Sequence, residues 1–421
     1  MSNSTVRRMN RRVARIGISL AAVVGIGLSI LVICGVGWLV KIESFPVAVI
    51  PVPAMPRHNA FDAFVASGKL LVRPNDIAAA SAGGSRDTIA QKAALVSANS
   101  AALAKFIPAL SKPYVNPPVR SIEQTMPYYG QFRNFARLLR LKSEVEAAQG
   151  QWQDSEETAL DAVRLGSDIP HGTPILGELV GISCEAIGRR SAWPPIDHLS
   201  ADEARKDIIQ LQGIQANEVS LSDVFLQEKW YGQACLLEFG RKDFYKSPVG
   251  TIMLHSGLYN YSHYMDQLIE SSRLPYRSRP ASPPIPHDML SAIIAPVFAG
   301  VGVKYTDNET QNQLMLVSLA LQAYKADHAA YPNSLSQLVP AYLKSVPDDP
   351  FANAGPLRYH RTGSTYILYS VGPDGKDDGG KAILNISSHY SERFKKMISD
   401  KPNRFVEADS KGDIVAGVNI Y

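Results

Sequence analysis

The stretch 309–329, ETQNQLMLVSLALQAYKADHA, decides the fold of the C-terminal part of this 421-residue chain. Its large apolar residues recur at helical spacing: Leu314, Val317, Leu321 and Tyr324. Its polar residues form a stripe roughly 60° wide on a helix: Gln311, Ser318, Gln322 and Lys325. Because most of the remaining circumference is apolar or Ala, we expect one side of this helix to be covered by a sheet and another by the preceding helical region.

Two short segments after this helix predict a β-hairpin. They are 357–361 (LRYHR) and 365–370 (TYILYS), and they flank a loop of about three residues, 362–364, that contains a glycine. Near the C-terminus a third strand is predicted by alternating residues: Ile414, Ala416, Val418 and Ile420. Residues 309–421 are therefore predicted to form an α+β module, a long helix with an antiparallel sheet.

This module resembles the major pseudopilin of type II secretion systems. The resemblance begins at 319–332 (LALQAYKADHAAYP), which is similar to the end of that family's long helix, and continues through YLK at 342–344 and PDDPF at 347–351. Residues 366–375 (YILYSVGPDG) and Gly379-Gly380 resemble its final strand and glycine-acid loop. In a pseudopilin the membrane segment runs directly into the long helix, whereas here about 270 residues separate the two. The resemblance therefore implies the fold of the module, over about 309–380, rather than a filament subunit.

The resemblance also implies a calcium site in the loop 374–380. The family's calcium loop maps onto Ser370, Asp374 and the glycines that follow, and this sequence adds Asp377 and Asp378, so the predicted ligands are these four residues. Calcium takes six to eight oxygens, more than this loop supplies. The remaining ligands would be backbone carbonyls, water, or a later acid such as Asp409 or Asp413. The alternative is a solvated turn whose Asp and Gly residues serve turn geometry.

An uncharged apolar run at 16–40 predicts a transmembrane helix, because about 20 apolar residues span a bilayer. Five Arg within the tail 1–15 place the N-terminus in the cytoplasm and the rest of the chain outside. The alternative, a cleaved signal peptide, has a shorter apolar core and a small-residue cleavage site. A stretch rich in proline, 41–56, predicts an extended stalk.

The region 57–275 is rich in Ala, Leu, Glu and Gln and predicts an α-helical domain, followed by a linker or crossover at 276–308. We predict helices over these ranges: 85–110, 122–149, 152–165, 174–190 and, after a capping box at Ser200, 201–240. This region, including Leu176–Ile182, is similar to bacterial membrane-anchored proteins to which no activity is assigned.

Composition excludes several classes. The net charge of +4 comes from the N-terminal arginines, and the remaining 38 basic against 39 acidic residues give no electrostatic basis for nucleic-acid binding. Three Cys make no disulfide framework, and a Cys184–Cys235 bond is the less favoured alternative to two buried thiols. The chain contains no GxSxG, HExxH, P-loop or GxGxxG motif. Two groups of histidines with neighbouring acids, His58 with Asp62 and His255 with His263, are more typical of surface pairs than of a catalytic site.

We therefore predict a mainly α, single-pass protein of the bacterial cytoplasmic (inner) membrane, with its bulk outside the cytoplasm. Its predicted role is structural or protein-interacting and non-enzymatic, with envelope proteins as partners and a link to type II secretion or pilus-like machinery. The sequence identifies no small-molecule ligand. The competing class is an envelope hydrolase with its site in the helical domain, for which a histidine hydrogen-bonded to a carboxylate in a cleft would be the sign.

Overall fold

The computed structural model describes residues 35–37, 50–82, 85–294, 300–384 and 406–419. The predicted membrane span 16–40 therefore lies outside the described residues except for 35–37, which are helical. The helices of the helical domain are α2 (Ala60–Gly68), α3 (Pro74–Ala80), α4 (Ile89–Ala98), α5 (Ser100–Phe106), η1 (Ile107–Ser111), α6 (Tyr128–Ala148), α7 (Trp152–Asp168), α8 (Ile175–Ile196), α9 (Ala201–Gln215), α10 (Leu221–Phe239), η2 (Asp243–Lys246) and α11 (Pro248–Ser272). The elements that follow are η3 (Tyr276–Ser278), α12 (Met289–Ile294), α13 (Val301–His328), η4 (Leu335–Leu338), β1 (Arg358–Thr362), β2 (Thr365–Ser370) and β3 (Ile414–Val415).

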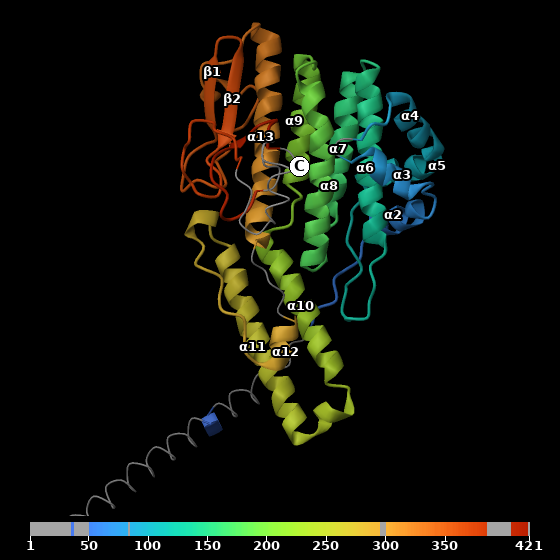
Figure 1. The fold of residues 1–421 in the computed structure, drawn as a ribbon, viewed down its shortest axis with the longest axis vertical. Coiled ribbons are helices and arrows are strands. Elements are labelled where there is room, and N and C mark those ends of the chain that lie inside the picture. Colours follow the sequence, from blue (N-terminus) through green and yellow to red (C-terminus); the bar gives the residue numbers. More distant parts are fainter. Residues whose placement is uncertain (1–34, 38–49, 83–84, 295–299, 385–405, 420–421) are drawn as a thin grey trace, which may run out of the picture.

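The elements form a row, with a helical hairpin extending from it. Figure 1 shows the row from the sheet through α13, α9, α8, α7 and α6 to the short helices α2–α5. The hairpin of α10 and α11, with α12 beside it, extends away from the row. Three apolar clusters hold these parts: one from α7 to the sheet, one from α2 to α8, and one within the hairpin. The prediction of a mainly α chain with a small antiparallel sheet is confirmed.

Helices α7 and α8 approach closely where glycines face each other. A Cβ added to Gly181 would lie 2.6 Å from the carbonyl oxygen of Gly166, and one added to Gly188 would lie 2.8 Å from that of Ala159. Side chains larger than hydrogen would separate the helices. This close crossing fixes the position of α8, which carries the polar side chains discussed below.

Helix α13 docks on the helical domain, as its nearly all-round apolar character predicts. It packs on α9 and α8, and its other side contacts β2. Leu314, Leu319 and Leu321 are fully or almost fully buried in the cluster that joins α7, α9 and the sheet. The long helix begins eight residues earlier than predicted, at Val301, after Gly300 in a left-handed conformation (φ 94°). Part of the predicted linker is thus helical.

The sheet is antiparallel, with the strand order β1-β2-β3. The hairpin loop has two residues rather than three, because Thr362 pairs with Thr365. The predicted third strand ends at Val415, since Gly417 adopts a positive φ of 72° and the side chain of Asn419 turns back to accept from the Val415 N–H. The alternating residues at 414–420 therefore predict a longer third strand than the structure has.

Several helix predictions in the helical domain are wrong at their boundaries. The predicted helix 201–240 is two helices, α9 and α10, separated by 216–220, and the predicted helix 122–149 begins only at Tyr128. The predicted helix 85–110 breaks at Asn99, whose buried side chain bonds both backbone groups of Val72 and so leaves the helical path. Helix α8 continues past Arg190 to Ile196, with Pro194 and Pro195 in its last turn. By contrast, the capping box at Ser200 is present as predicted.

Among the described residues, no single helix combines the length and hydropathy of a membrane span. The bent pair Ile89–Ala98 and Ser100–Ser111, at 65°, reaches those limits only when joined.

Candidate functional site

The acidic loop that follows β2 is closed by a carboxylate from the end of the chain. Asp413, fully buried, accepts from the Gly380 N–H (2.7 Å) through Oδ2 and from the Asp378 N–H (3.4 Å) through Oδ1. The Asp413 N–H in turn donates to the Lys381 carbonyl (2.7 Å). Of the two later acids considered from sequence, the structure places Asp413 at the loop.

Asp377 stands beside this carboxylate on the exposed side of the loop. Its Oδ1 accepts from the Tyr369 hydroxyl (2.9 Å) and from the Gly379 N–H (3.0 Å), and Arg358 lies 3.6 Å from its Oδ2. Burial, together with the like charges of Asp377 and Asp378, raises the pKa of Asp413 to about 6. Positive charge near the loop would oppose the part of this shift that comes from the like charges.

Ser370 and Asp374, the other two predicted ligands, are engaged elsewhere. The buried Ser370 hydroxyl donates to Asp349 Oδ1 (2.6 Å), and Asp349 also accepts from the Val371 N–H (2.9 Å). Asp374 Oδ1 accepts from the Lys376 N–H (3.1 Å), which is a turn contact within the loop. The structure therefore places Asp413 against the backbone of Asp378 and Gly380, with Asp377 nearby, and gives Ser370 a role in holding Asp349 to the end of β2.

Within the described ranges, no three His, Cys, Asp or Glu side chains converge closely enough to hold a metal ion. The donor chemistry of the loop nevertheless suits calcium, which accepts carboxylates together with backbone carbonyls and water. Glycines at 375, 379 and 380 all have positive φ, and these conformations let a short loop turn its carbonyls.

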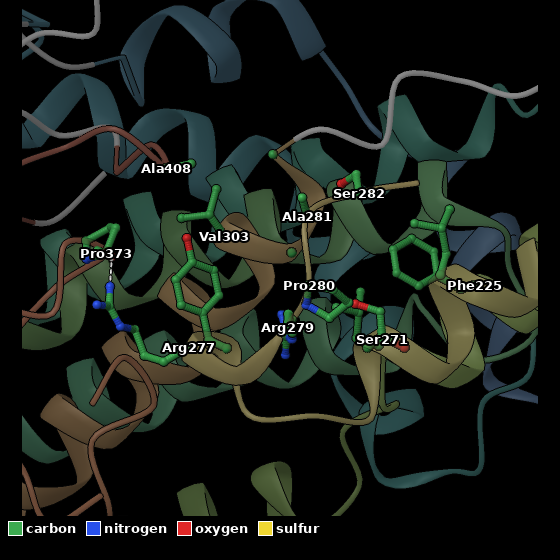
Figure 2. A pocket seen from close by; sticks show the side chains of 16 residues that line it. Phe225, Ser271, Arg277, Arg279, Pro280, Ala281, Ser282, Val303, Pro373 and Ala408 are labelled. Atoms are coloured by element: carbon green, nitrogen blue, oxygen red, sulfur yellow. Dashed lines mark hydrogen bonds between the residues drawn. The ribbon is translucent and has the colours of Figure 1, made fainter. Parts of the chain in front are cut away.

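A cavity of about 420 Å³ lies on the other side of this loop. Figure 2 shows Arg277, from the segment after α11, reaching Pro373 at the loop's start; its Nη1 donates to the Pro373 carbonyl (2.9 Å). A Cβ on Gly375 would lie 2.6 Å from the Arg277 guanidinium carbon, so the arginine packs directly on the loop. The linker of the helical domain thus holds the acidic loop by one arginine.

A second polar group, which we call the α8–α13 junction, is buried except for Glu218, which is half-buried. It consists of Glu185, Arg189, Glu218, Asn308 and Asn312. Arg189 donates from Nη2 to Asn308 (2.8 Å), and from Nη1 to Asn312 (2.7 Å) and Glu185 (3.1 Å). The amide of Asn312 donates to Glu185 (2.7 Å) and to Glu218 (2.9 Å). These bonds fix the long helix of the module to the helical domain.

Carboxylates outnumber the arginine at this junction. Burial raises the pKa of Glu185, and burial with the nearby Glu185 raises the pKa of Glu218 to about 8. Burial also raises the pKa of Glu178 well above its ordinary value, and that of Asp307 to about 7. Arg189 is therefore the positive charge that offsets part of the free-energy cost of burying these acids.

Two further carboxylates are buried between α7 and α9 without a cation. Glu156 and Asp207 are each fully buried. Both Glu156 oxygens and Asp207 Oδ2 lack a hydrogen-bond partner, while Asp207 Oδ1 accepts from Gln153 (3.2 Å). Burial raises the pKa of Glu156 well above its ordinary value and that of Asp207 to about 7. Burial therefore favours the protonated form of both side chains.

The histidine groups singled out in the sequence do not form a site in the structure. His263 contacts the amide of Gln267 (2.9 Å), and the nearby Asp266 pairs with Lys229 (2.5 Å). Tyr261 points into the hairpin core, where its hydroxyl donates to the Glu228 carbonyl (2.9 Å).

The two cysteines within the described residues are free thiols. Cys184 and Cys235 are both buried and belong to different apolar clusters. The less favoured expectation of a disulfide between them is therefore not met.

Sequence reasoning missed the α8–α13 junction. Its signal was present as an i, i+4 Glu185–Arg189 pair within a helix that is otherwise rich in glycine and apolar residues. Such a pair on a helix of this composition indicates a buried, rather than a solvated, arginine.

No protein-family model, curated protein or solved structure matches the chain.

Proposed function

We propose that this chain is a single-pass, membrane-anchored protein of the bacterial envelope, with a non-enzymatic structural or protein-interaction role outside the cytoplasmic membrane. One observation carries the proposal: α13 is enclosed by α8 and α9 on one side and by β2 on the other. The long helix of a filament subunit must be free to pack against other copies. Enclosed as it is here, the pseudopilin-like module acts as a fixed part of one folded body.

The contacts of the histidines support a non-enzymatic role. His171 and His328 contact backbone carbonyls through Nδ1 (both 3.0 Å), and His198 stacks on Trp152 with ring centroids 3.8 Å apart. A hydrolase using a histidine base needs that histidine oriented by a carboxylate or a similar group. These side chains instead serve packing and helix termini.

Calcium is the cofactor that the loop chemistry favours. We assign its binding to Asp377, Asp378 and Asp413, with backbone carbonyls and water completing the oxygen set. Bound calcium would neutralise the carboxylates and so stabilise the end of β2 and β3. Envelope proteins of type II secretion or pilus-like machinery are the partner class that the resemblance of the module favours.

The topology part of the proposal is tested by protease protection. Protease added outside intact bacterial spheroplasts should digest everything beyond the stalk 41–56 and leave the N-terminal tail protected. Recovery of a mature protein that begins near residue 41 would overturn the anchor.

The interaction part is tested by site-specific photo-crosslinking in the same cells. Ile209 on α9, 71% exposed, is a suitable position for the crosslinking residue. Crosslinks to other envelope proteins are expected. A ladder of crosslinks to further copies of the chain would instead indicate a filament subunit and contradict the proposal.

A further inference from the structure

Among the strands that the structure describes, β1 forms an outer edge of the sheet (Figure 1). The Ala416 N–H donates to the Leu368 carbonyl (3.0 Å), so the backbone groups of Leu368 point to β3 and away from β1. Tyr359 stands opposite Leu368 in the antiparallel register, and its own N–H and C=O therefore point outward. The same holds for Arg361, two residues further along the strand. The outer edge thus offers the N–H and C=O groups of both residues to an added strand.

The open part of this edge is short. It begins after Leu357, because the Leu357 N–H donates to the Pro347 carbonyl (3.4 Å) and the chain around 347 covers the edge there. For Tyr359 and Arg361, no residue in the described ranges provides a backbone partner on the outer side. An incoming strand can therefore pair along the five residues of β1, with alternate residues bonded to the edge.

The solvent-facing side of β1 is basic. Arg358, His360 and Thr362 alternate on this face, and the last two are exposed. Arg358 is half-buried and lies 3.6 Å from Asp377, which offsets part of its charge. This face therefore attracts an anionic side chain only moderately.

Arg361 adds positive charge on the opposite face of the strand. Its Nη1 donates to the Tyr331 carbonyl (2.7 Å) and to Asn333 Oδ1 (3.1 Å), and its Nε donates to the Gly363 carbonyl (3.0 Å). These acceptors are all neutral. A carboxylate brought to the edge would meet the Arg361 guanidinium without having to displace another carboxylate from it.

We propose that β1 binds an extended acidic segment of a partner protein, which adds to the sheet beside β1 with Asp or Glu side chains facing Arg358 and Arg361. Main-chain hydrogen bonds to a sheet edge supply affinity, and the side chains that alternate along the added strand supply specificity. A second copy is the poorer occupant, because pairing of β1 with itself would bring the arginines of both copies together. The inference rests on the protein-interaction role proposed above and deepens it by naming an edge and the charge of the partner.

The test is binding of a synthetic peptide to the full chain in nanodiscs of zwitterionic lipid. The probe is Val-Glu-Glu-Val-Glu with blocked ends and a neutral fluorophore, and fluorescence anisotropy measures its affinity. Antiparallel pairing with β1 places the acids of this peptide opposite Arg361, His360 and Arg358. Binding of this peptide is expected, and the same peptide with Lys in place of Glu should bind much more weakly, because it brings like charges to the edge.

Methylation of peptide nitrogens separates strand addition from simple charge attraction. In the same pairing, the N–H groups of peptide residues two and four face the outward carbonyls of Arg361 and Tyr359. Methylation of both nitrogens should weaken binding by about tenfold or more, because it removes two hydrogen bonds. Methylation of residue three alone, whose N–H points away from the edge, is the control and should change the affinity little.

A matched pair of protein variants tests the edge from the other side. Arg361→Pro removes the outward N–H and leaves the bonds between β1 and β2, as proline does at sheet edges. Arg361→Ala removes the same side chain but keeps the N–H. The Pro variant should bind the peptide about fivefold more weakly than the Ala variant. Lys112→Gln, at an exposed lysine of the helical domain, should bind as the wild type does. Circular dichroism melts check folding, and if Arg361→Pro does not fold, the methylated peptides decide.

Four results would overturn the proposal. They are equal binding of the two methylated peptides, equal binding of the acidic and basic peptides, equal affinities of the folded Pro and Ala variants, and a wild-type dimer that Arg361→Pro dissociates, which would assign the edge to a second copy. None of these measurements depends on membrane topology or on crosslinks from Ile209. Their failure is therefore distinguishable from failure of the proposed function.

Discussion

The α8–α13 junction and the acidic loop both gather carboxylates, but they balance the charge differently. At the junction Arg189 is built into the fold, and it bonds Glu185 and two asparagines in the interior. At the loop Asp413 is held by backbone N–H groups, Arg358 lies 3.6 Å from Asp377 and is partly exposed, and Arg277 packs on the loop at Gly375. The junction thus has an arginine bonded directly to a buried carboxylate, whereas the buried carboxylate of the loop is bonded to backbone N–H groups.

The pair Glu156 and Asp207 is a third case, in which both carboxylates are fully buried and three of their four oxygens lack a hydrogen-bond partner among the described residues. Burial raises the pKa of both side chains and so favours their protonated forms. Comparison of the three shows that the buried acids differ in their surroundings: one group is bonded to an arginine, one carboxylate is bonded to backbone N–H groups, and one pair has most of its oxygens unbonded within the described residues.

The largest effect is expected from removing the junction's cation. Arg189→Met leaves Glu185 and Glu218 enclosed without a positive partner, which should cost about 3–5 kcal/mol of stability. Equilibrium urea unfolding in nanodiscs measures this. Arg273→Met, which breaks an exposed ion pair with Glu270, is the matched control and should change the midpoint little. Adding Glu185→Gln should restore part of the loss. A cost no larger than that of the control would mean that Arg189 is not the neutralising group.

The next effect concerns pH. Because the folded-state pKa of Asp207 is raised from 3.8 to about 7, the folded chain holds this proton more tightly than the unfolded chain. The protonated side chain of Asp207 therefore contributes to the free energy of unfolding below about pH 4. This contribution is lost as pH rises through 7, and the loss is at most about 4 kcal/mol. In Asp207→Asn the fall in urea midpoint between pH 5 and pH 8 should be smaller than in the wild type. Asp202→Asn, fully exposed on the same helix, should keep the wild-type slope. Equal slopes in all three proteins would refute the assignment.

A smaller effect is expected from the ion at the loop. Calcium at tenfold excess over its Kd should stabilise the full chain by about 1.4 kcal/mol, with a Kd on the order of 10⁻⁴–10⁻³ M. Thermal melts with millimolar calcium and with chelator measure the shift. Asp413→Asn should abolish it, and Asp409→Asn, at the other late acid, should retain it. If the wild-type melting temperature is the same with calcium and with chelator, the loop is a turn that binds no calcium.

The smallest effect separates a structural hydroxyl from a ligand. Ser370→Ala removes the donor to Asp349 Oδ1 and should cost about 1 kcal/mol. Because the hydroxyl is committed to Asp349, the calcium-induced shift in melting temperature should remain. Loss of that shift in a variant that still folds would restore Ser370 to the ligand set.

The fold could be predicted from sequence wherever local pattern and burial agree. The apolar circumference of 309–329 predicted a helix covered on two sides, and Ser200 with Glu203 predicted the start of α9. The errors occur where a distant residue competes with the local pattern. Asn99 ends a helix because its side chain bonds Val72, 27 residues away, and no periodicity in 85–110 reports that contact.

The site could be predicted only in part for the same reason. The acids of the loop are adjacent in sequence and were visible, as was the general possibility of a late acid. Arg189 and its partners Asn308 and Asn312 are separated by 119 and 123 residues, so their convergence depends on the docking of α13.

The closure of the acidic loop by Asp413 has a consequence for the order of biosynthesis. Gly380 and the carboxylate that accepts its N–H are 33 residues apart. At translation rates of about 5–20 residues per second, the loop emerges roughly 2–7 s before its partner is made. During that interval the helical bundle is already synthesised, but β3 and Asp413, whose carboxylate closes the loop, are not yet made. A chain cut short between these two points would keep α13 and lose the hydrogen bonds by which Asp413 closes the loop.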